Sequence, residues 1–233
     1  LDGEIAFVGG VDLARSRWDD RSHALDNPLR REKGEPQKPY HDVMAFATGA
    51  IVQDLEALFR GRWRLVTGES IVLRRPERAP RPLAPRDALP IRCKRVAFSR
   101  TLRDEDAVDR SLFDVKQLYE NGIAAAERLI YIETQYFTSR AIHDALVGRM
   151  RAGGTPPIQI VIVMPRGADT PKEGVAIGPA QDEVLSSLEE VASDTGAELR
   201  IVYSAQHGED GALVPTFIHS KLLIVDDRLL SVG

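Results

Sequence analysis

Residues 219–233, with the sequence HSKLLIVDDRLLSVG, constrain the fold of this chain more than any other stretch. They hold His219, Lys221 and Asp226 at the spacing H-x-K-x4-D, and Gly233 follows after six further residues. The apolar residues among them predict an extended strand, on which alternate side chains share one face. His219 and Lys221 then project together, about 6–7 Å apart along the strand.

An imidazole beside a fixed ammonium group suits chemistry on a phosphate ester. Lys221 can bind the non-bridging oxygens as a point charge, while His219 attacks phosphorus or protonates the leaving oxygen. The alternative is a single buried histidine that serves only the core. That alternative does not account for the lysine, aspartate and glycine at their fixed spacing.

The start of the chain repeats the second part of this pattern. Asp2 and Gly9 are separated by the same number of residues as Asp226 and Gly233. An internal repeat is first of all evidence about architecture. Two copies of the pattern predict two halves of similar fold.

The spacing H-x-K-x4-D-x6-G resembles the HKD motif of the phospholipase D superfamily, and other stretches narrow the resemblance. GGVDLARSRWDDRSH, PYHDVMAFATGAIVQDLEALFRGRW and IYIETQYF are similar to stretches of the eukaryotic-type phospholipase D branch. Together they cover most of the chain. Tyr40 and Thr134 depart from the usual forms, which have Trp and Asn there.

The resemblance implies an active site at the seam between two halves, with one His–Lys pair from each. One histidine attacks phosphorus and forms a phosphohistidine, while His219 protonates the leaving alcohol and then deprotonates water or an acceptor alcohol. Lys221 stabilises charge on the equatorial oxygens. The first pair would precede Leu1. We therefore expect an internal segment, from the end of the first motif to the end of the second, that is inactive by itself.

Alternating strands and helices predict the α/β class, with two pseudo-repeat halves that each form a layered mixed sheet with helices on both faces. Residues 1–75 are expected to be the remainder of the first half. Residues 76–90 hold five prolines and predict a linker. Residues 91–233 are expected to form the second half with the HKD motif.

The second half is predicted in more detail. Ser111 and Asp114 suggest a capping box at the start of a helix, and the final strand is expected to carry His219. The other elements of this half are strands near 91–98, 129–133, 158–164 and 199–203, and helices around 140–152 and 179–194.

The other motif residues are candidates for supporting roles. Asp226 is grouped with the catalytic residues, and bracing of the motif by hydrogen bonds is favoured over direct chemistry; Asp2 is its counterpart. Gly9 and Gly10 predict a turn that a phosphate can approach closely, with an ordinary tight turn as the alternative. Asp12 is expected to order polar groups beside the substrate.

His41 and Asp42 open a strand whose counterpart in the family comes close to the catalytic histidine. A carboxylate there can fix a histidine tautomer, as in a hydrolase triad; surface capping is the alternative. Gln135 is a candidate donor to a phosphate or headgroup, with backbone pairing as the alternative. His23 and the pair Arg30–Arg31 lie in polar stretches, where we expect exposure to solvent.

Composition narrows the class of partner. The net charge is −4, with 31 Lys and Arg against 35 Asp and Glu, which argues against nucleic acid as the main partner. Cys93 is the single cysteine, so no internal disulfide forms. The proposed chemistry needs no metal or cofactor. No apolar run is long enough for a transmembrane helix.

Three functions remain. The first is a phospholipase D-type phosphodiesterase or transphosphatidylase, which acts on a glycerophospholipid at a membrane surface with water or an alcohol as acceptor. It implies a cytoplasmic or peripheral membrane location. The second is an HKD-type nuclease, and the third is a non-catalytic scaffold of the same fold. The stretches that resemble the eukaryotic-type branch favour the first over the second, and the intact His219-x-Lys221 pair favours both over the third.

Overall fold

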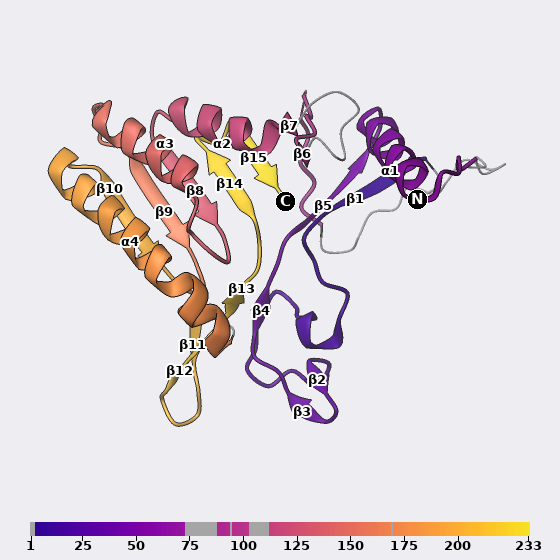
Figure 1. Cartoon of the computed structure of the whole chain (residues 1–233). Helices are drawn as coiled ribbons and strands as arrows, with labels where there is room; N and C mark the ends of the chain where they lie inside the picture. Colours follow the sequence, from indigo (N-terminus) through magenta and orange to yellow (C-terminus); the bar gives the residue numbers. More distant parts are fainter. Residues whose placement is uncertain (1–2, 73–87, 94, 103–111, 169) are drawn as a thin grey trace. The chain divides into compact units, whose positions relative to one another are not determined.

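The computed structural model describes residues 3–72, 88–93, 95–102, 112–168 and 170–233 (Figure 1). The chain forms two compact units. Unit 1 consists of Leu1–Val8 and Ala45–Val115, and unit 2 consists of Gly9–Met44 and Lys116–Gly233. The units are thus interleaved in sequence, whereas the predicted boundaries at 75 and 91 give consecutive halves. Most of the predicted linker, residues 76–87, lies outside the described residues.

Unit 2 is built on a five-stranded mixed sheet with the strand order β10-β9-β8-β14-β15. β8, β9 and β10 are parallel, and β14 runs antiparallel to both β8 and β15. The parallel strands are joined through helices, as parallel strands require. The strands are β8 (Leu129–Glu133), β9 (Gln159–Val163), β10 (Glu198–Val202), β14 (Leu222–Val225) and β15 (Leu229–Val232).

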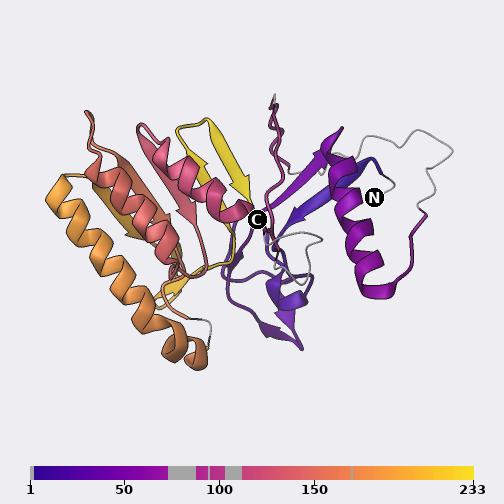
Figure 2. The ribbon, with the colours of Figure 1, turned by 45° about the horizontal axis from the view of Figure 1, so that its top comes forward.

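Three helices cover one face of this sheet: α2 (Asp114–Ala124), α3 (Arg140–Arg151) and α4 (Pro171–Thr195). Figures 1 and 2 show them on the same side of the strands. The α/β class is confirmed, but in unit 2 no described helix covers the opposite face, where helices were also expected. Both helical connections between parallel strands pass on one side, consistent with the uniform handedness of such crossovers.

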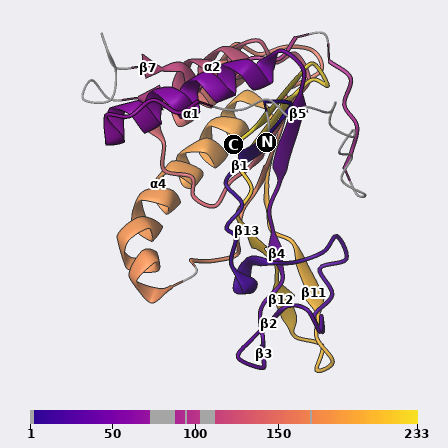
Figure 3. The same ribbon diagram turned by 90° about the vertical axis from the view of Figure 1, so that its right-hand side faces the viewer.

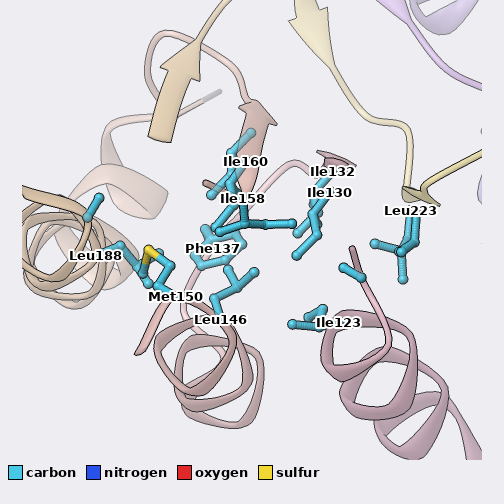
Figure 4. Close-up of a cluster of buried hydrophobic side chains, with 14 of the residues drawn as sticks. Ile123, Ile130, Ile132, Phe137, Leu146, Met150, Ile158, Ile160, Leu188 and Leu223 are labelled. Carbon is cyan, nitrogen blue, oxygen red and sulfur yellow. The ribbon is translucent and has the colours of Figure 1, made fainter. Parts of the chain in front are cut away.

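The core lies between this face and the helices (Figure 4). Alternate strand residues point into it, so that Ile130 and Ile132 of β8 meet Ile123 of α2 and Leu146 of α3 in one cluster. All four are at most 2% exposed. Burying one such side chain contributes about 1.5–3 kcal/mol. The inner strands β8 and β14 are therefore anchored by a rigid core.

Helix boundaries follow capping chemistry. Ser139 caps α3 and accepts a hydrogen bond from the Ile142 N–H. Thr170 caps α4 in the same way, and Pro171 occupies its first turn, where proline is tolerated. α4 therefore begins eight residues before the predicted start at 179.

The segment 9–44 of unit 2 is mostly irregular and contains the short elements η1 (Arg15–Arg17), β2 (Arg31–Glu32), β3 (Glu35–Pro36) and β4 (Tyr40–His41). β4 pairs in parallel with β13 (Phe217–Ile218). Two hairpins lie near this pair in Figure 3. One is formed by β2 and β3, and the other by β11 (Ala205–His207) and β12 (Leu213–Pro215). Gln206 of β11 also donates to the carbonyl groups of Ser22 and His23. The segment is thus joined to the carboxyl-terminal part of unit 2.

Unit 1 contains helix α1 (Ile51–Thr67), the paired strands β1 (Ile5–Gly9) and β5 (Met44–Thr48), and the paired strands β6 (Thr101–Leu102) and β7 (Leu112–Phe113). The predicted strand at 91–98 is wrong: the described residues there form no strand, and Ile91 and Val96 are 63% and 55% exposed. The alternating pattern was present, but no described strand offers a partner. Ser111, half of the predicted capping box, lies outside the described residues. No described helix is both long and apolar enough to cross a membrane.

Two helical glycines provide a matched test of this packing. A Cβ atom on Gly122 of α2 would come within 2.7 Å of a methyl carbon of Leu229, whereas one on Gly148 of α3 would meet nothing within 4 Å. Gly148→Ala should raise the free energy of unfolding by about 0.5–1 kcal/mol, because alanine loses less backbone entropy.

Gly122→Ala should be less stable than Gly148→Ala by about 1–3 kcal/mol, because the extra methyl overpacks the core. Urea denaturation of the two variants and the wild type measures this difference. Equal stabilisation by both substitutions would contradict the placement of α2 against β15.

Candidate active site

The His–Lys motif lies where the chain changes partner strands. His219, Ser220 and Lys221 connect β13, which pairs with β4, to β14, which pairs with β8 and β15. The predicted continuous strand is therefore interrupted at the motif itself. Because these residues leave one ladder before entering the next, their positions depend on side-chain and loop contacts.

Asp42 holds the imidazole of His219. His219 Nδ1 lies 2.8 Å from Asp42 Oδ2, and the two side chains are 16% and 6% exposed. The backbone N–H of His219 also donates to the carbonyl oxygen of His41 at 2.8 Å. A carboxylate at this position requires a hydrogen on Nδ1 and leaves the Nε2 lone pair of a neutral ring for chemistry. The structure thus brings both predicted supporting residues, His41 and Asp42, to the motif.

Lys221 is half-buried, and its ammonium group donates to the carbonyl oxygen of His219 at 2.5 Å. Burial lowers the pKa of Lys221 below its usual value, although the negative charges of Asp42 and Asp12 oppose this effect. A Cβ atom on Gly10 would lie 3.8 Å from Lys221 Nζ. The structure therefore places two of the predicted substrate-binding residues, Gly10 and Asp12, beside the lysine.

Three other predicted site residues are placed differently. Gly9 has a φ of +157°, and a Cβ atom there would lie 3.0 Å from Met44 Cα, so its close approach is to the neighbouring strand. Gln135 donates to the hydroxyl group of Tyr136 at 2.7 Å, and no hydrogen bond joins it to the motif within the described part of the chain. Asp2 lies outside the described residues.

Asp226 braces the sheet. It is 6% exposed, and its carboxylate accepts hydrogen bonds from three consecutive backbone N–H groups, those of Glu127, Arg128 and Leu129. Burial alone raises the pKa of Asp226, but these donors reverse the effect and bring the pKa below its usual value. This geometry matches the bracing role favoured from the sequence, and it ties the β14–β15 turn to the start of β8.

The sequence interpretation missed Glu133, which ends β8. Its Oε2 lies 3.0 Å from His41 Nε2 and accepts from the Ser220 hydroxyl at 2.5 Å, while Oε1 accepts from the Tyr131 hydroxyl at 2.6 Å. Burial by itself raises the pKa of Glu133, but bonds from His41, Ser220 and Tyr131 lower it to about 2. A carboxylate at the end of the apolar run LIYIE was the available signal, because buried charges are rare without partners.

A second buried cluster corrects two expectations. Arg30, predicted to be exposed, is 1% exposed and bonded to Asp19 and to backbone carbonyl groups. His23, also expected in solvent, is half-buried, with Nδ1 3.0 Å from Asp19 Oδ2 and Nε2 3.3 Å from His41 Nδ1. Asp19 also accepts from the Tyr40 N–H at 2.8 Å. The loop that carries Asp42 is therefore held by buried charges that its polar sequence did not reveal.

The substitution Asp226→Asn tests the bracing role. It should lower the free energy of unfolding at neutral pH by about 1–3 kcal/mol, because three backbone N–H groups lose a charged acceptor. Because the pKa of Asp226 is lower in the folded than in the unfolded state, its carboxylate stabilises the fold above the unfolded-state pKa. This stability is lost as the pH falls through the folded-state pKa. Denaturation curves should thus converge for wild type and variant in acid. A variant of unchanged stability that has lost turnover would instead indicate direct chemistry.

Comparisons with known proteins show to which family the chain belongs. The family model described as phospholipase D matches residues 3–144. Phospholipase D alpha 1 of Zea mays is 27% identical over 174 residues, which cover 57% of this chain and 21% of that protein. Phospholipase D A of Dictyostelium discoideum is 24% identical over an alignment that covers all of this chain and 22% of that protein. The chain thus spans about a fifth of the length of these relatives.

Among solved structures, the phospholipase D family member Nuc of Salmonella typhimurium superposes with a TM-score of 0.31 and 19% identity, over 52% of this chain and 62% of Nuc. That superposition adds nothing to the assignment. The family model covers more than half of the chain, so this chain belongs to the phospholipase D family.

Proposed function

We propose that this chain supplies one half of the active site of a phospholipase D that cleaves a glycerophospholipid at its distal phosphodiester bond, or transfers the phosphatidyl group to an alcohol. The observation that carries the proposal is the hydrogen bond from His219 to the buried carboxylate of Asp42, with Lys221 beside it. A histidine oriented in this way can exchange a proton through Nε2, and an ammonium group at its side can bind the phosphate.

The reaction would proceed in two balanced steps. An imidazole outside residues 1–233 attacks phosphorus, and His219 gives its Nε2 proton to the leaving headgroup alcohol. The phosphohistidine is then attacked by water or an acceptor alcohol, whose proton returns to His219. Lys221 stabilises the equatorial oxygens in both transition states. One histidine cannot be nucleophile and opposing acid at once, so we expect the 233 residues to be inactive alone.

Two observations favour a lipid over nucleic acid as substrate. The net charge of −4 is unlike the basic track that binds a polynucleotide backbone. The relatives from maize and Dictyostelium are named phospholipases D. The enzyme would meet its substrate at a membrane surface, where a local basic site and an apolar rim are sufficient. A nuclease that uses the same chemistry is the second candidate.

Substitution of the motif tests the chemistry in the longer protein that the proposal implies. His219→Ala and Lys221→Ala should each reduce lipid turnover by about 10²–10⁴-fold with the fold retained, because general acid–base catalysis and charge stabilisation are lost. Lys221→Arg should also fail, since a planar guanidinium does not replace a point charge. Release of the headgroup is measured, with circular dichroism to check folding.

The exposed His207 provides the control, and His207→Ala should leave turnover unchanged. A diester with a good leaving group should partly restore the activity of His219→Ala, because the leaving oxygen then needs no proton. Near-normal turnover of an ordinary phospholipid by His219→Ala would exclude the proposed mechanism.

The choice of substrate is tested with two assays in parallel. The longer protein is given phosphatidylcholine vesicles with a primary alcohol, or a single-stranded oligonucleotide. We expect a phosphatidyl-alcohol product and an intact oligonucleotide. Efficient cleavage of the oligonucleotide without lipid turnover would replace the phospholipase proposal with the nuclease.

A further inference from the structure

Four side chains form a continuous hydrogen-bonded chain next to the His219–Asp42 pair. In order they are Asp19, His23, His41 and Glu133. The three links measure 3.0 Å from Asp19 to His23 Nδ1, 3.3 Å from His23 Nε2 to His41 Nδ1, and 3.0 Å from His41 Nε2 to Glu133. Two imidazoles thus lie in series between two carboxylates.

The number of hydrogens in this chain follows from its geometry. Each outer link joins a ring nitrogen to a carboxylate and needs a hydrogen on that nitrogen, because an ionised carboxylate only accepts. The central nitrogen–nitrogen link needs one hydrogen more. Three hydrogens on two rings give the pair of histidines one net positive charge.

The charges of neighbouring groups place this proton on His41. Its bond to Glu133 raises the pKa of His41 above the usual value, burial opposes the increase, and the charges of Glu133 and Asp42 add to it. Asp19 is ionised, since its hydrogen bonds outweigh the opposing effect of burial and lower its pKa. His41 therefore donates at both nitrogens, and His23 accepts from His41 at Nε2 and donates to Asp19 at Nδ1.

Other groups around the chain are accounted for in the same way. Arg30 pairs with Asp19, and Tyr131 donates to Glu133. The pKa of Tyr131 is raised by burial and by its bond to Glu133, so it stays protonated. Asp42 faces His219 and the charge of Lys221, and the carboxylate of Asp20 lies near His23.

Both sides of the catalytic pair are attached to this chain. Glu133 accepts from Ser220, which lies between His219 and Lys221. His41 directly precedes Asp42, and its carbonyl oxygen accepts from the His219 N–H. His41 is held at both ring nitrogens, by His23 and by Glu133, so loss of either link would let the ring shift. A shift of His41 would move Asp42 and the His–Lys motif relative to each other.

We propose that Glu133, His41 and His23 are positioning residues that hold Asp42 against His219 only while the two histidines share one extra proton. The proposal rests on the proposed function insofar as His219 is the acid–base group. Above the pKa of His41 the extra proton is lost, and two neutral rings cannot maintain all three links. The chain therefore sets an alkaline limit to phosphodiester turnover.

The direction of the pH effect follows from the linkage between proton binding and folding. A histidine whose folded-state pKa is raised contributes stability that is fully present below the unfolded-state pKa and is lost as the pH rises through the folded-state value. Glu133→Gln removes the charge that raises the pKa of His41. The alkaline decline of kcat should therefore move to lower pH in this variant.

The experiment measures kcat and KM as a function of pH for the longer protein, with bis(p-nitrophenyl) phosphate and with phosphatidylcholine as substrates. Glu133→Gln should lower kcat about 10- to 100-fold with little change in KM, as expected for a misplaced catalytic group. His41→Gln should have a similar effect. The double variant should be no worse than either single variant, because the two residues act as a unit. Glu198→Gln and His207→Gln, which lie outside the chain of four, are the matched controls and should match the wild type.

A second measurement needs no folded variant of Glu133. In protein labelled at histidine, NMR gives the titration of His41 and the exchange of the His219 Nδ1 hydrogen that faces Asp42. His41 should titrate above the usual histidine pKa, and that hydrogen should exchange faster above the same pH. Two results would overturn the proposal. One is a normal or lowered pKa of His41, and the other is an exchange rate of the His219 Nδ1 hydrogen that does not change as His41 titrates.

The outcomes separate this inference from the proposed function. If the wild type cleaves the chromogenic diester but no lipid, the assignment of a lipid substrate is wrong. The positioning proposal is still tested by the turnover of the diester. If Glu133→Gln keeps the wild-type kcat and pH profile on both substrates, the positioning proposal is wrong, while the proposed phospholipase function is unaffected. If the wild type cleaves neither substrate, the NMR titration alone decides.

Discussion

The parallel contact between β4 and β13 is the interaction on which the site depends. It aligns Ile218 with His41 and joins the His219 N–H to the His41 carbonyl oxygen. Residues far apart in sequence are thereby held in register, and Asp42 meets His219 as a result. Two residues of ladder are a weak restraint by themselves, so the alignment needs the buried contacts around it.

Those contacts come in two kinds. The apolar cluster between the sheet and α2, α3 and α4 fixes β8 and β14, which end and begin at the site. The contact of Glu133 with His41 then attaches the irregular segment 9–44 to this rigid frame, and the contact of Asp19 with Arg30 holds the segment together internally. Buried ion pairs contribute little net stability compared with apolar packing, but removing one partner costs about 3–5 kcal/mol. Such a network therefore specifies one arrangement rather than adding greatly to stability.

The two ends of the His–Lys–Asp motif have different surroundings. His219 and Lys221 lie between two strands and not within either, while both neighbouring strands are anchored. The His219 N–H donates to the His41 carbonyl oxygen, and the Lys221 carbonyl oxygen accepts from the Gly233 N–H. Asp226, the third residue of the motif, braces the sheet through the backbone of residues 127–129. One motif thus carries the proposed acid–base pair at one end and a residue that braces the sheet at the other.

The sequence by itself determined the family, the α/β class and the positions of β8, β9 and β10, because local apolar periodicity and the His–Lys spacing are written in neighbouring residues. It also predicted the supporting roles of His41 and Asp42, through resemblance. It did not predict the exposed stretch at 91–98, because a strand pattern does not reveal whether a partner strand exists.

Only the tertiary structure decided that Arg30 is buried and His23 half-buried, and that Glu133 bonds to His41 and Ser220. It also decided that segment 9–44 belongs with the carboxyl-terminal sheet. The two bonds of Glu133 join residues 92 and 87 positions apart. A polar side chain in an irregular stretch has the same local sequence whether it faces water or a buried partner. Its environment is set by which distant segment folds against it, and no local pattern records that choice.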